Sequence, residues 1–210
     1  MGFISILSFA HKLMEERVQA GETVIDATAG NGVDTVFLAK QVGMEGIVYA
    51  FDIQETAIAC TAARCAQEVP GHRVELVLRS HAELADAIPV EHHGRIAAVA
   101  FNLGYLPGHD HGTVTLPDST LAALQAAAGL LRRGGIITIV LYTGHPGGPE
   151  EAEAVEAWAA ALPQADYQVL TYRFLNQRNR PPYVIAIEKK DSLVYPKHPL
   201  LIQKRDAFFV

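Results

Sequence analysis

The feature that most constrains the fold is a regular alternation of short apolar runs with longer segments of helical periodicity. The runs predicted to be strands cover residues 23–27, 46–52, 73–78, 95–101 and 135–142. Strands that alternate with helices of about 10–15 residues are typical of a parallel sheet with helices on both faces. The sequence therefore predicts an α/β fold.

The segments between and after these runs complete the pattern. Helices are predicted over residues 33–42, 56–69, 118–133 and 149–162. We expect Asp118 to cap the third helix and Gly134-Gly135 to end it, because Asp favours the N-cap and Gly the C-terminus. Two last strand-like runs, "YQVLTYRF" and "YVIAIEKK", are joined by "LNQRNRPP" without a helix. This connection predicts an antiparallel hairpin at one edge of the sheet.

The length and composition predict a single domain. A chain of 210 residues, half of them apolar, can bury one core. We expect a domain over residues 1–190 and a tail over 191–210 whose role the sequence leaves open. A helix predicted over 3–14 and the alanine-rich helices 118–131 and 152–161 are expected to be mostly core, with no function of their own.

Hydropathy and cysteine content exclude several classes of protein. No apolar run reaches the roughly 18 residues that a membrane helix needs. The N-terminus lacks the basic residues and the cleavage site of a signal peptide. Cys60 and Cys65 form neither a disulfide framework nor a metal-binding pattern, which fits a reducing cytosol. We therefore expect a cytoplasmic protein without a membrane span.

Charge bears on whether the partner is a nucleic acid. The net charge of −6 argues against a generic nucleic-acid coat. Residues 170–210, however, carry eight Lys/Arg and three Asp/Glu, so this segment is basic. Arg178 and Arg180 lie in the predicted hairpin loop, where they either contact phosphates or bases of a substrate or form a solvated tip. A homodimer would join two such basic edges.

Polar residues follow the first two strands, at the edge where an open α/β sheet binds its ligand. In "DATAGNGVDT" (26–35), Gly30 permits a tight turn. Asn31 and Asp34 suit a ligand with an ammonium group, whereas a phosphate cradle would need bare N–H groups and a lysine. Asp52 ends the second strand, about 20 residues beyond the glycine loop, where a carboxylate accepts both ribose hydroxyls. Otherwise Asp52 caps the following helix.

Ser80 and His81 follow the third strand. They are placed to meet an adenine edge, although Ser80 alone is better explained as the cap of a short helix. Together with the glycine loop and Asp52, these strand ends describe a nucleoside ligand that has a charged amino-acid end.

"DATAGNGVDT", the strand-end Asp52 and "NLGYLPG" resemble class I S-adenosylmethionine (SAM)-dependent methyltransferases. More closely, they are similar to the small bacterial MnmM/YtqB family, which methylates the aminomethyl group on 2-thiouridine at the tRNA wobble position. The resemblance spans about residues 5–190, with Ala27 where many methyltransferases have the first glycine of the loop. It implies a Rossmann-like class I sheet, mostly parallel with an antiparallel C-terminal hairpin. SAM is the implied cofactor, and the tRNA anticodon stem-loop is the implied substrate.

The layout and the resemblance together assign roles to individual residues. The residues expected to bind SAM are Ala27, Gly30, Asn31, Asp34, Asp52, Gln54, Ser80, His81 and Asn102. The residues expected to take part in catalysis are Asn102, Leu103, Tyr105 and His109. The residues expected on the substrate side are Tyr105, Tyr142, His145, Arg178 and Arg180, although "LYTGHPGG" would also serve as a plain turn.

The stretch "FNLGYLPGHDH" (101–111) ends the fourth strand. The side-chain carbonyl of Asn102 and the backbone carbonyl of Leu103 can accept N–H bonds and orient a neutral amine. Tyr105 offers a ring on which a flipped base could stack. His109 and His111 lack a third ligand at metal-site spacing, so a pocket-shaping loop, or a base that takes the amine proton, is favoured over a metal site. We expect no metal.

Two alternatives stay open. The first is a methyltransferase that acts on another RNA or on a small-molecule amine. The second, of a different class, is an NAD-type dinucleotide-binding protein, since a glycine loop and Asp52 also fit NAD. Against NAD, the loop lacks the third glycine of G-x-G-x-x-G and places Asp34 where it would repel a pyrophosphate.

Overall fold

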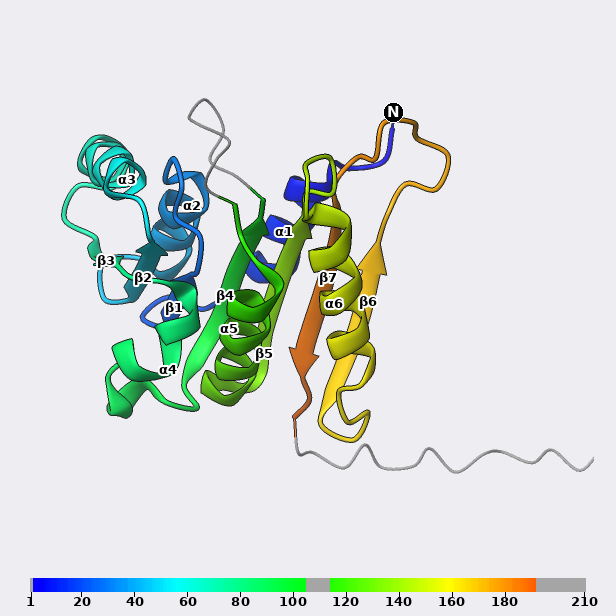
Figure 1. The fold of residues 1–210 in the computed structure, drawn as a ribbon. Helices are drawn as coiled ribbons and strands as arrows, with labels where there is room; N and C mark the ends of the chain where they lie inside the picture. The colour runs from blue at the N-terminus through cyan, green and yellow to red at the C-terminus, as the bar shows by residue number, and fades with distance from the viewer. Residues whose placement is uncertain (1, 105–113, 192–210) are drawn as a thin grey trace, which may run out of the picture.

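One mixed sheet forms the centre of the molecule. The computed structural model describes residues 2–104 and 114–191, and Figure 1 shows its elements. The strands are β1 (Thr23–Asp26), β2 (Ile47–Asp52), β3 (Arg73–Leu78), β4 (Ile96–Leu103), β5 (Leu131–Leu141), β6 (Tyr167–Tyr172) and β7 (Tyr183–Lys189). Within the described residues they lie in the order β3-β2-β1-β4-β5-β7-β6.

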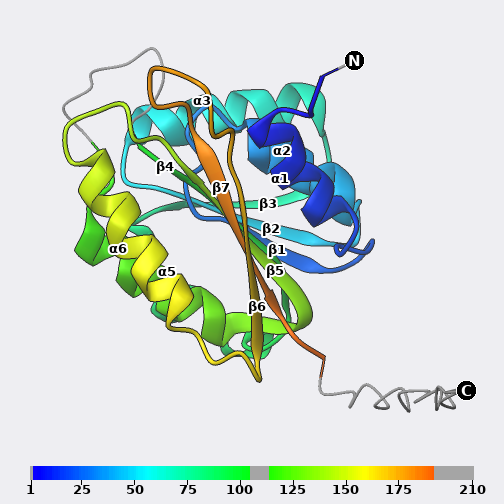
Figure 2. The same cartoon turned by 90° about the vertical axis from the view of Figure 1, so that its right-hand side faces the viewer.

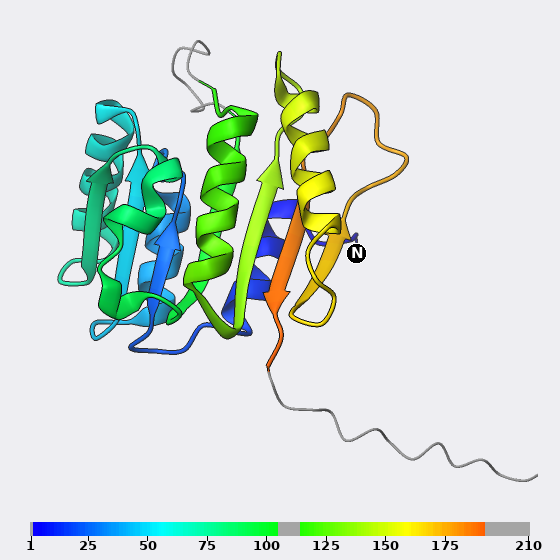
Figure 3. The same ribbon diagram turned by 60° about the horizontal axis from the view of Figure 1, so that its bottom comes forward.

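Strand directions confirm the predicted topology. Each of the neighbouring pairs among β1 to β5 is parallel, whereas β7 is antiparallel to both β5 and β6. Figure 3 shows β7 running opposite to β5. The hairpin lies at the β5 edge, with β7 inserted between β5 and β6. The carboxyl ends of β1 to β5 therefore meet at one edge of the sheet, where such folds bind ligands.

Helices cover both faces of the sheet, as the sequence predicts. They are α1 (Ile6–Glu15), α2 (Val33–Val42), α3 (Glu55–Glu68), α4 (Leu84–Ala87), α5 (Pro117–Leu130) and α6 (Gly148–Ala160), with short 3₁₀ turns η1 (His81–Glu83) and η2 (Val90–His92). Figure 2 shows α1, α2 and α3 on one face and α5 and α6 on the other. Every residue of β4 but one is buried, because helices cover this central strand on both sides.

The prediction for the helix over residues 118–133 was wrong at both ends. The helix ends at Leu130 and its N-cap is Leu116, so Asp118 lies in the first turn rather than at the cap. Gly134 and Gly135 belong to β5. A Cβ on Gly135 would lie 3.0 Å from the backbone oxygen of Ala97. Gly135 therefore permits close approach of β5 to β4 where the register of the two strands is irregular, and neither glycine ends a helix.

Helix α1 is held on the sheet by contacts with β5 and β7. The Thr138 hydroxyl of β5 lies 3.5 Å from the Met14 sulfur, and Arg17 pairs with Glu188 of β7 at 2.7 Å. Just before the helix begins, the backbone oxygen of Ile4 accepts a hydrogen bond from the Tyr172 hydroxyl at 3.0 Å. These contacts hold α1 along the sheet, with its first turn near the carboxyl ends of the parallel strands and its last turn toward their amino ends.

None of the helices within the described residues has the length and apolar character that a membrane crossing requires.

Candidate active site

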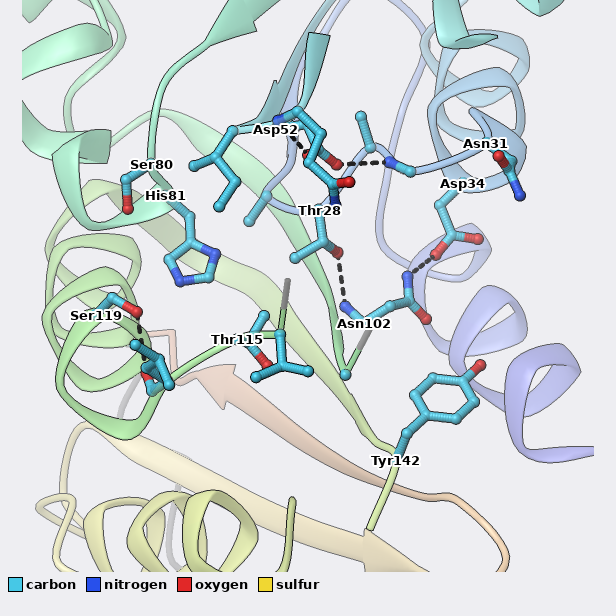
Figure 4. Close-up of a pocket in the computed structure, with 18 of the residues that line it drawn as sticks. Thr28, Asn31, Asp34, Asp52, Ser80, His81, Asn102, Thr115, Ser119 and Tyr142 are labelled. Atoms are coloured by element: carbon cyan, nitrogen blue, oxygen red, sulfur yellow. Dashed lines mark hydrogen bonds between the residues drawn. The ribbon is translucent and has the colours of Figure 1, made fainter. Parts of the chain in front are cut away.

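A cleft of about 540 Å³ opens at the carboxyl ends of the parallel strands. This volume is typical of sites for cofactor-sized ligands. Figure 4 shows its lining side chains, which come mainly from the loops after β1 to β5. The predicted site residues that line it are Ala27, Gly30, Asn31, Asp34, Asp52, Gln54, Ser80, His81, Asn102 and Tyr142. The structure thus brings together every residue expected to bind the cofactor.

The loop after β1 and the end of β2 are joined through Asp52. One carboxylate oxygen accepts the Gly30 N–H at 3.0 Å, and the other accepts the Gln54 N–H at 3.0 Å. A carboxylate oxygen has two lone pairs, so each retains acceptor capacity for a ligand. Gly32 ends this loop with φ of +76°, and a Cβ there would lie 3.0 Å from Thr61 Cα. The turn therefore requires glycine at position 32.

Asp26 lies beneath this loop and is fully buried. Its carboxylate accepts the Thr35 hydroxyl at 2.6 Å and the Thr28 N–H at 3.2 Å. Burial, assisted by the nearby charge of Asp34, raises the pKa of Asp26 to about 7. Asp26 does not line the cleft, so it supports the loop from below.

The loop after β3 contributes Ser80 and His81. The Ser80 hydroxyl accepts the Ala82 N–H at 3.2 Å, which confirms its role as a cap of η1. His81 is buried and packs edge-on against Phe101, with ring centroids 5.9 Å apart. Burial lowers the pKa of His81, although the Ala27 backbone and Asp52 act in the opposite direction. A neutral imidazole, which both donates and accepts, therefore faces the cleft at neutral pH.

Asn102, at the end of β4, is held at both ends. Its backbone N–H donates to the Thr28 hydroxyl at 2.7 Å, and its side-chain Nδ2 donates to an Asp34 oxygen at 2.6 Å. Figure 4 shows the amide oxygen pointing away from Asp34, on the side where the Tyr142 ring lies. This arrangement presents an acceptor to a ligand in the cleft.

Leu103 and Tyr142 are neighbours across β4 and β5. The Leu103 carbonyl accepts the Tyr142 N–H at 3.0 Å, and the Leu103 side chain is buried and does not line the cleft. An amine N–H that binds this carbonyl, as the sequence predicts, would therefore compete with the Tyr142 N–H. Burial and the charge of Asp34 raise the pKa of Tyr142, so its phenol keeps its proton at neutral pH.

Other predicted residues lie elsewhere. His145 and Arg180 line a second depression of about 550 Å³ together with Asn179 and Glu150, not the cleft. Arg178 is exposed and lines neither. The predictions for Tyr105, His109 and His111 fall outside the described residues. Among residues 2–104 and 114–191, no group of three or more His, Cys, Asp or Glu is arranged to hold a metal ion.

Several lining residues were missed by sequence reasoning, among them Leu7, Thr28 and Thr115. Thr28 lies inside the glycine-loop motif, so its position in the sequence is a signal for the cleft. No pattern in the sequence points to Thr115 as a cleft residue, because its position depends on a distant residue. Its hydroxyl donates to the buried Glu151 of α6 at 2.6 Å.

The sheet order and the position of the cleft define the class of protein. A mostly parallel sheet with an antiparallel C-terminal hairpin, and with a ligand-sized cleft at the strand ends, is the architecture of Rossmann-like SAM-dependent methyltransferases. The family model described as "Putative rRNA methylase" matches residues 48–188. The chain belongs to this family.

Similar proteins agree with this assignment. A chloroplastic tRNA (mnm5s2U34)-methyltransferase of Arabidopsis thaliana is 42% identical over 190 residues, which cover 87% of this chain and 69% of the relative. The crystal structure of a "putative rRNA-methylase" from Clostridium thermocellum is 41% identical, with a TM-score of 0.85, and the match covers 90% of this chain and all of that one.

A "putative methyltransferase" from Streptococcus mutans, solved in complex with SAH, the demethylated form of SAM, is 34% identical with a TM-score of 0.80. That match covers 90% of this chain and 99% of the other. The protein is therefore a methyltransferase with SAM as its cofactor, and the NAD-type alternative is set aside.

Proposed function

We propose that this enzyme methylates the 5-aminomethyl group of 2-thiouridine at the wobble position of tRNA. The observation that carries the proposal is the amide oxygen of Asn102, which faces the cleft beside the protonated phenol of Tyr142. An acceptor of this kind suits a nucleophile that has N–H bonds. The name of the Arabidopsis relative, which is 42% identical, supports the tRNA substrate.

The residues of the cleft fit SAM. Asp52 retains acceptor capacity for the two ribose hydroxyls, and the neutral His81 lies where a nucleobase would be placed. Asp34 contributes negative charge that attracts the positively charged end of the cofactor, although both of its oxygens already accept bonds from protein side chains. When bound, SAM supplies a methyl group attached to a positively charged sulfur.

Asn102 then orients the nucleophile. A primary amine is mostly protonated at pH 7, and it has a lone pair for attack only after it loses a proton. The Asn102 oxygen accepts an N–H of the neutral amine, and this bond aims the lone pair along one direction. The Tyr142 hydroxyl, which keeps its proton, is a second group that can bond to the amine or to the modified base.

The exposed loop between β6 and β7 is the proposed contact for the rest of the RNA. Arg178 and Arg180 lie on it, and guanidinium groups bind phosphates. The positive φ of Arg180, +46°, belongs to a turn at the tip of this hairpin. Tyr105 as a stacking platform, His109 as a proton acceptor and a homodimer that joins two basic edges remain predictions.

The test is mass analysis of nucleosides after incubation of the enzyme with methyl-labelled SAM and tRNA that carries the unmethylated aminomethyl group. We expect 5-aminomethyl-2-thiouridine to become one methyl group heavier. Ribosomal RNA, tRNA without the aminomethyl group and a free alkyl amine are parallel substrates, and Asn102→Ala is the low-activity control. Label that enters ribosomal RNA or the free amine, and not the tRNA, would contradict the proposal.

A further inference from the structure

Helix α1, which the sequence predicts to be mostly core, places a histidine at the edge of the cleft. His11 Nε2 lies 2.6 Å from an oxygen of Asp34, and the two side chains are 25% and 12% exposed. The imidazole lies flat on the Phe37 ring of α2, with centroids 4.0 Å apart and planes within 3°. His11 therefore has a defined orientation as well as a defined partner. It also lies outside residues 48–188, the part of the chain that the family model matches.

His11, Asp34 and Asn102 form a continuous chain of hydrogen bonds. One Asp34 oxygen contacts His11 Nε2, and the other accepts Asn102 Nδ2, both at 2.6 Å. The carboxylate is thus held between two groups from different elements, α1 and β4. A substitution at any one of the three positions should therefore disturb the geometry of the other two.

The chain of hydrogen bonds determines the orientation of the Asn102 amide. An amide has an acceptor oxygen on one side and a donor NH₂ on the other. If the amide rotates by half a turn, it presents NH₂ to the cleft, and that group cannot accept an N–H from an amine. Asp34 selects the productive orientation because a carboxylate accepts from Nδ2 but repels the amide oxygen.

We propose that His11 is a positioning residue for methyl transfer: it holds the Asp34 carboxylate so that the Asn102 amide oxygen stays turned toward the amine. This inference rests on the proposed function, because the orientation matters only if the acceptor in the cleft has N–H bonds. His11 itself does not line the cleft, so it acts through Asp34.

The alternative is that the pair of His11 and Asp34 only stabilises α1 against α2. A partly exposed pair of polar side chains contributes little to folding, typically about 0–1 kcal/mol. Helix α1 is also held by Arg17 on Glu188 and by Tyr172 on Ile4. A purely structural role therefore predicts a small change in stability and no change in turnover.

Two substitutions separate these roles. His11→Phe keeps a flat ring on Phe37 but removes the bond to Asp34, whereas His11→Gln offers an amide N–H in its place. We expect His11→Phe to lower kcat by about 10- to 100-fold, since small displacements of an orienting group cost that much. KM for tRNA and Kd for SAH should stay within about threefold of wild type. His11→Gln should restore part of kcat, and Glu15→Gln, an exposed change one turn along α1, is the matched control.

A readout that does not depend on activity is the side-chain amide signal of Asn102 in NMR spectra, assigned by its absence in Asn102→Ala. We expect His11→Phe to shift the Nδ2 proton signals and His11→Gln to return them toward wild type. Unchanged kcat together with unchanged amide signals in His11→Phe would overturn the inference. If the wild-type enzyme does not methylate the aminomethyl tRNA, the proposed function is refuted instead. In that case the NMR signals still test the chain of hydrogen bonds, because an Asn102 amide signal in His11→Phe equal to that of wild type would refute it.

Discussion

The two halves of the cleft are held together in different ways. The half that binds the methyl donor SAM (the donor half) is formed by the loops after β1, β2 and β3. It contains Gly30, Asp52, Gln54, Ser80 and His81. Its hydrogen bonds join these loops to each other or to the next turn. The half that faces the methyl acceptor (the acceptor half) contains His11, Asp34, Asn102 and Tyr142. Its bonds join helix α1 to the start of α2 and the start of α2 to the end of β4. The first half follows from the local order of strands, whereas the second requires α1 to be in place on the sheet. Changes in the donor half should therefore alter cofactor affinity, and changes at His11, Asn102 and Tyr142 should mainly alter turnover. Asp34, whose charge also attracts the positive end of SAM, should affect both.

Asn102→Ala should have the largest effect. The change removes the acceptor for the amine, and we expect kcat to fall by roughly 100- to 1000-fold, the range for removal of one preorganised hydrogen-bonding group. Kd for SAH should change by only a few-fold. Single-turnover methyl transfer and calorimetric titration with SAH measure the two quantities. A larger loss of SAH affinity than of kcat would move Asn102 into the donor half.

Asp52→Ala should show the opposite pattern. Two hydrogen bonds from ribose hydroxyls to a carboxylate are lost, each worth about 1.5–3 kcal/mol, so Kd for SAH should rise by about 100-fold or more. At saturating SAM, kcat should stay within about tenfold of wild type. Asp52→Asn, which keeps the shape and acceptor oxygen, should lose less affinity. An unchanged Kd in Asp52→Ala would refute the assignment of the ribose site.

Asp26→Asn tests the support that both halves share, because Asp26 holds Thr28, which in turn bonds to Asn102. The native state keeps the Asp26 proton up to pH about 7, whereas the unfolded chain releases it near 3.8. The native state therefore binds more protons in this window, and its free energy of unfolding falls as the pH rises from about 4 to 7. The slope from Asp26 is on the order of 1 kcal/mol per pH unit.

Urea unfolding at pH 5 and pH 8 measures this effect. Asparagine resembles the protonated carboxyl and does not titrate. The free energy of unfolding of Asp26→Asn minus that of wild type should therefore be more favourable to the variant at pH 8 than at pH 5. A difference between variant and wild type that is the same at both pH values would contradict the raised pKa.

Arg178→Glu combined with Arg180→Glu should have the smallest effect, confined to RNA binding. We expect a loss of tRNA affinity and a salt dependence that is shallower by about one unit of slope for each phosphate that the arginines no longer neutralise. Kd for SAH should not change. Arg95→Glu, an exposed change at the amino-terminal end of β4, is the control. A salt slope equal to that of wild type would mean that the loop is a solvated tip.

The same contrast explains what the sequence could predict. The strand ends with Gly30, Asp52 and His81 follow from periodicity and from the rule that open sheets bind ligands at their carboxyl edge. The end of α5 was misjudged, because Gly134 and Gly135 are typical of a helix terminus, whereas both lie in β5 and Gly135 permits the close approach of β4. No local pattern distinguishes a glycine that ends a helix from one that admits a neighbouring strand.

His11 shows the limit most clearly. One histidine in an amphipathic helix gives no local signal, and its function depends on Asp34, on Phe37 and on the packing of α1 against β5 and β7. Only tertiary structure brings these groups together. The acceptor half was therefore predicted through Asn102 and Tyr142 but without the residue that holds it.

The most direct test of the two-part cleft is a crystal structure of the protein with SAH. We predict that the ribose hydroxyls bond to Asp52 and that the sulfur faces Asn102 and Tyr142 across a space large enough for an aminomethyl group. SAH bound with its sulfur turned away from Asn102, or bound outside this cleft, would contradict it.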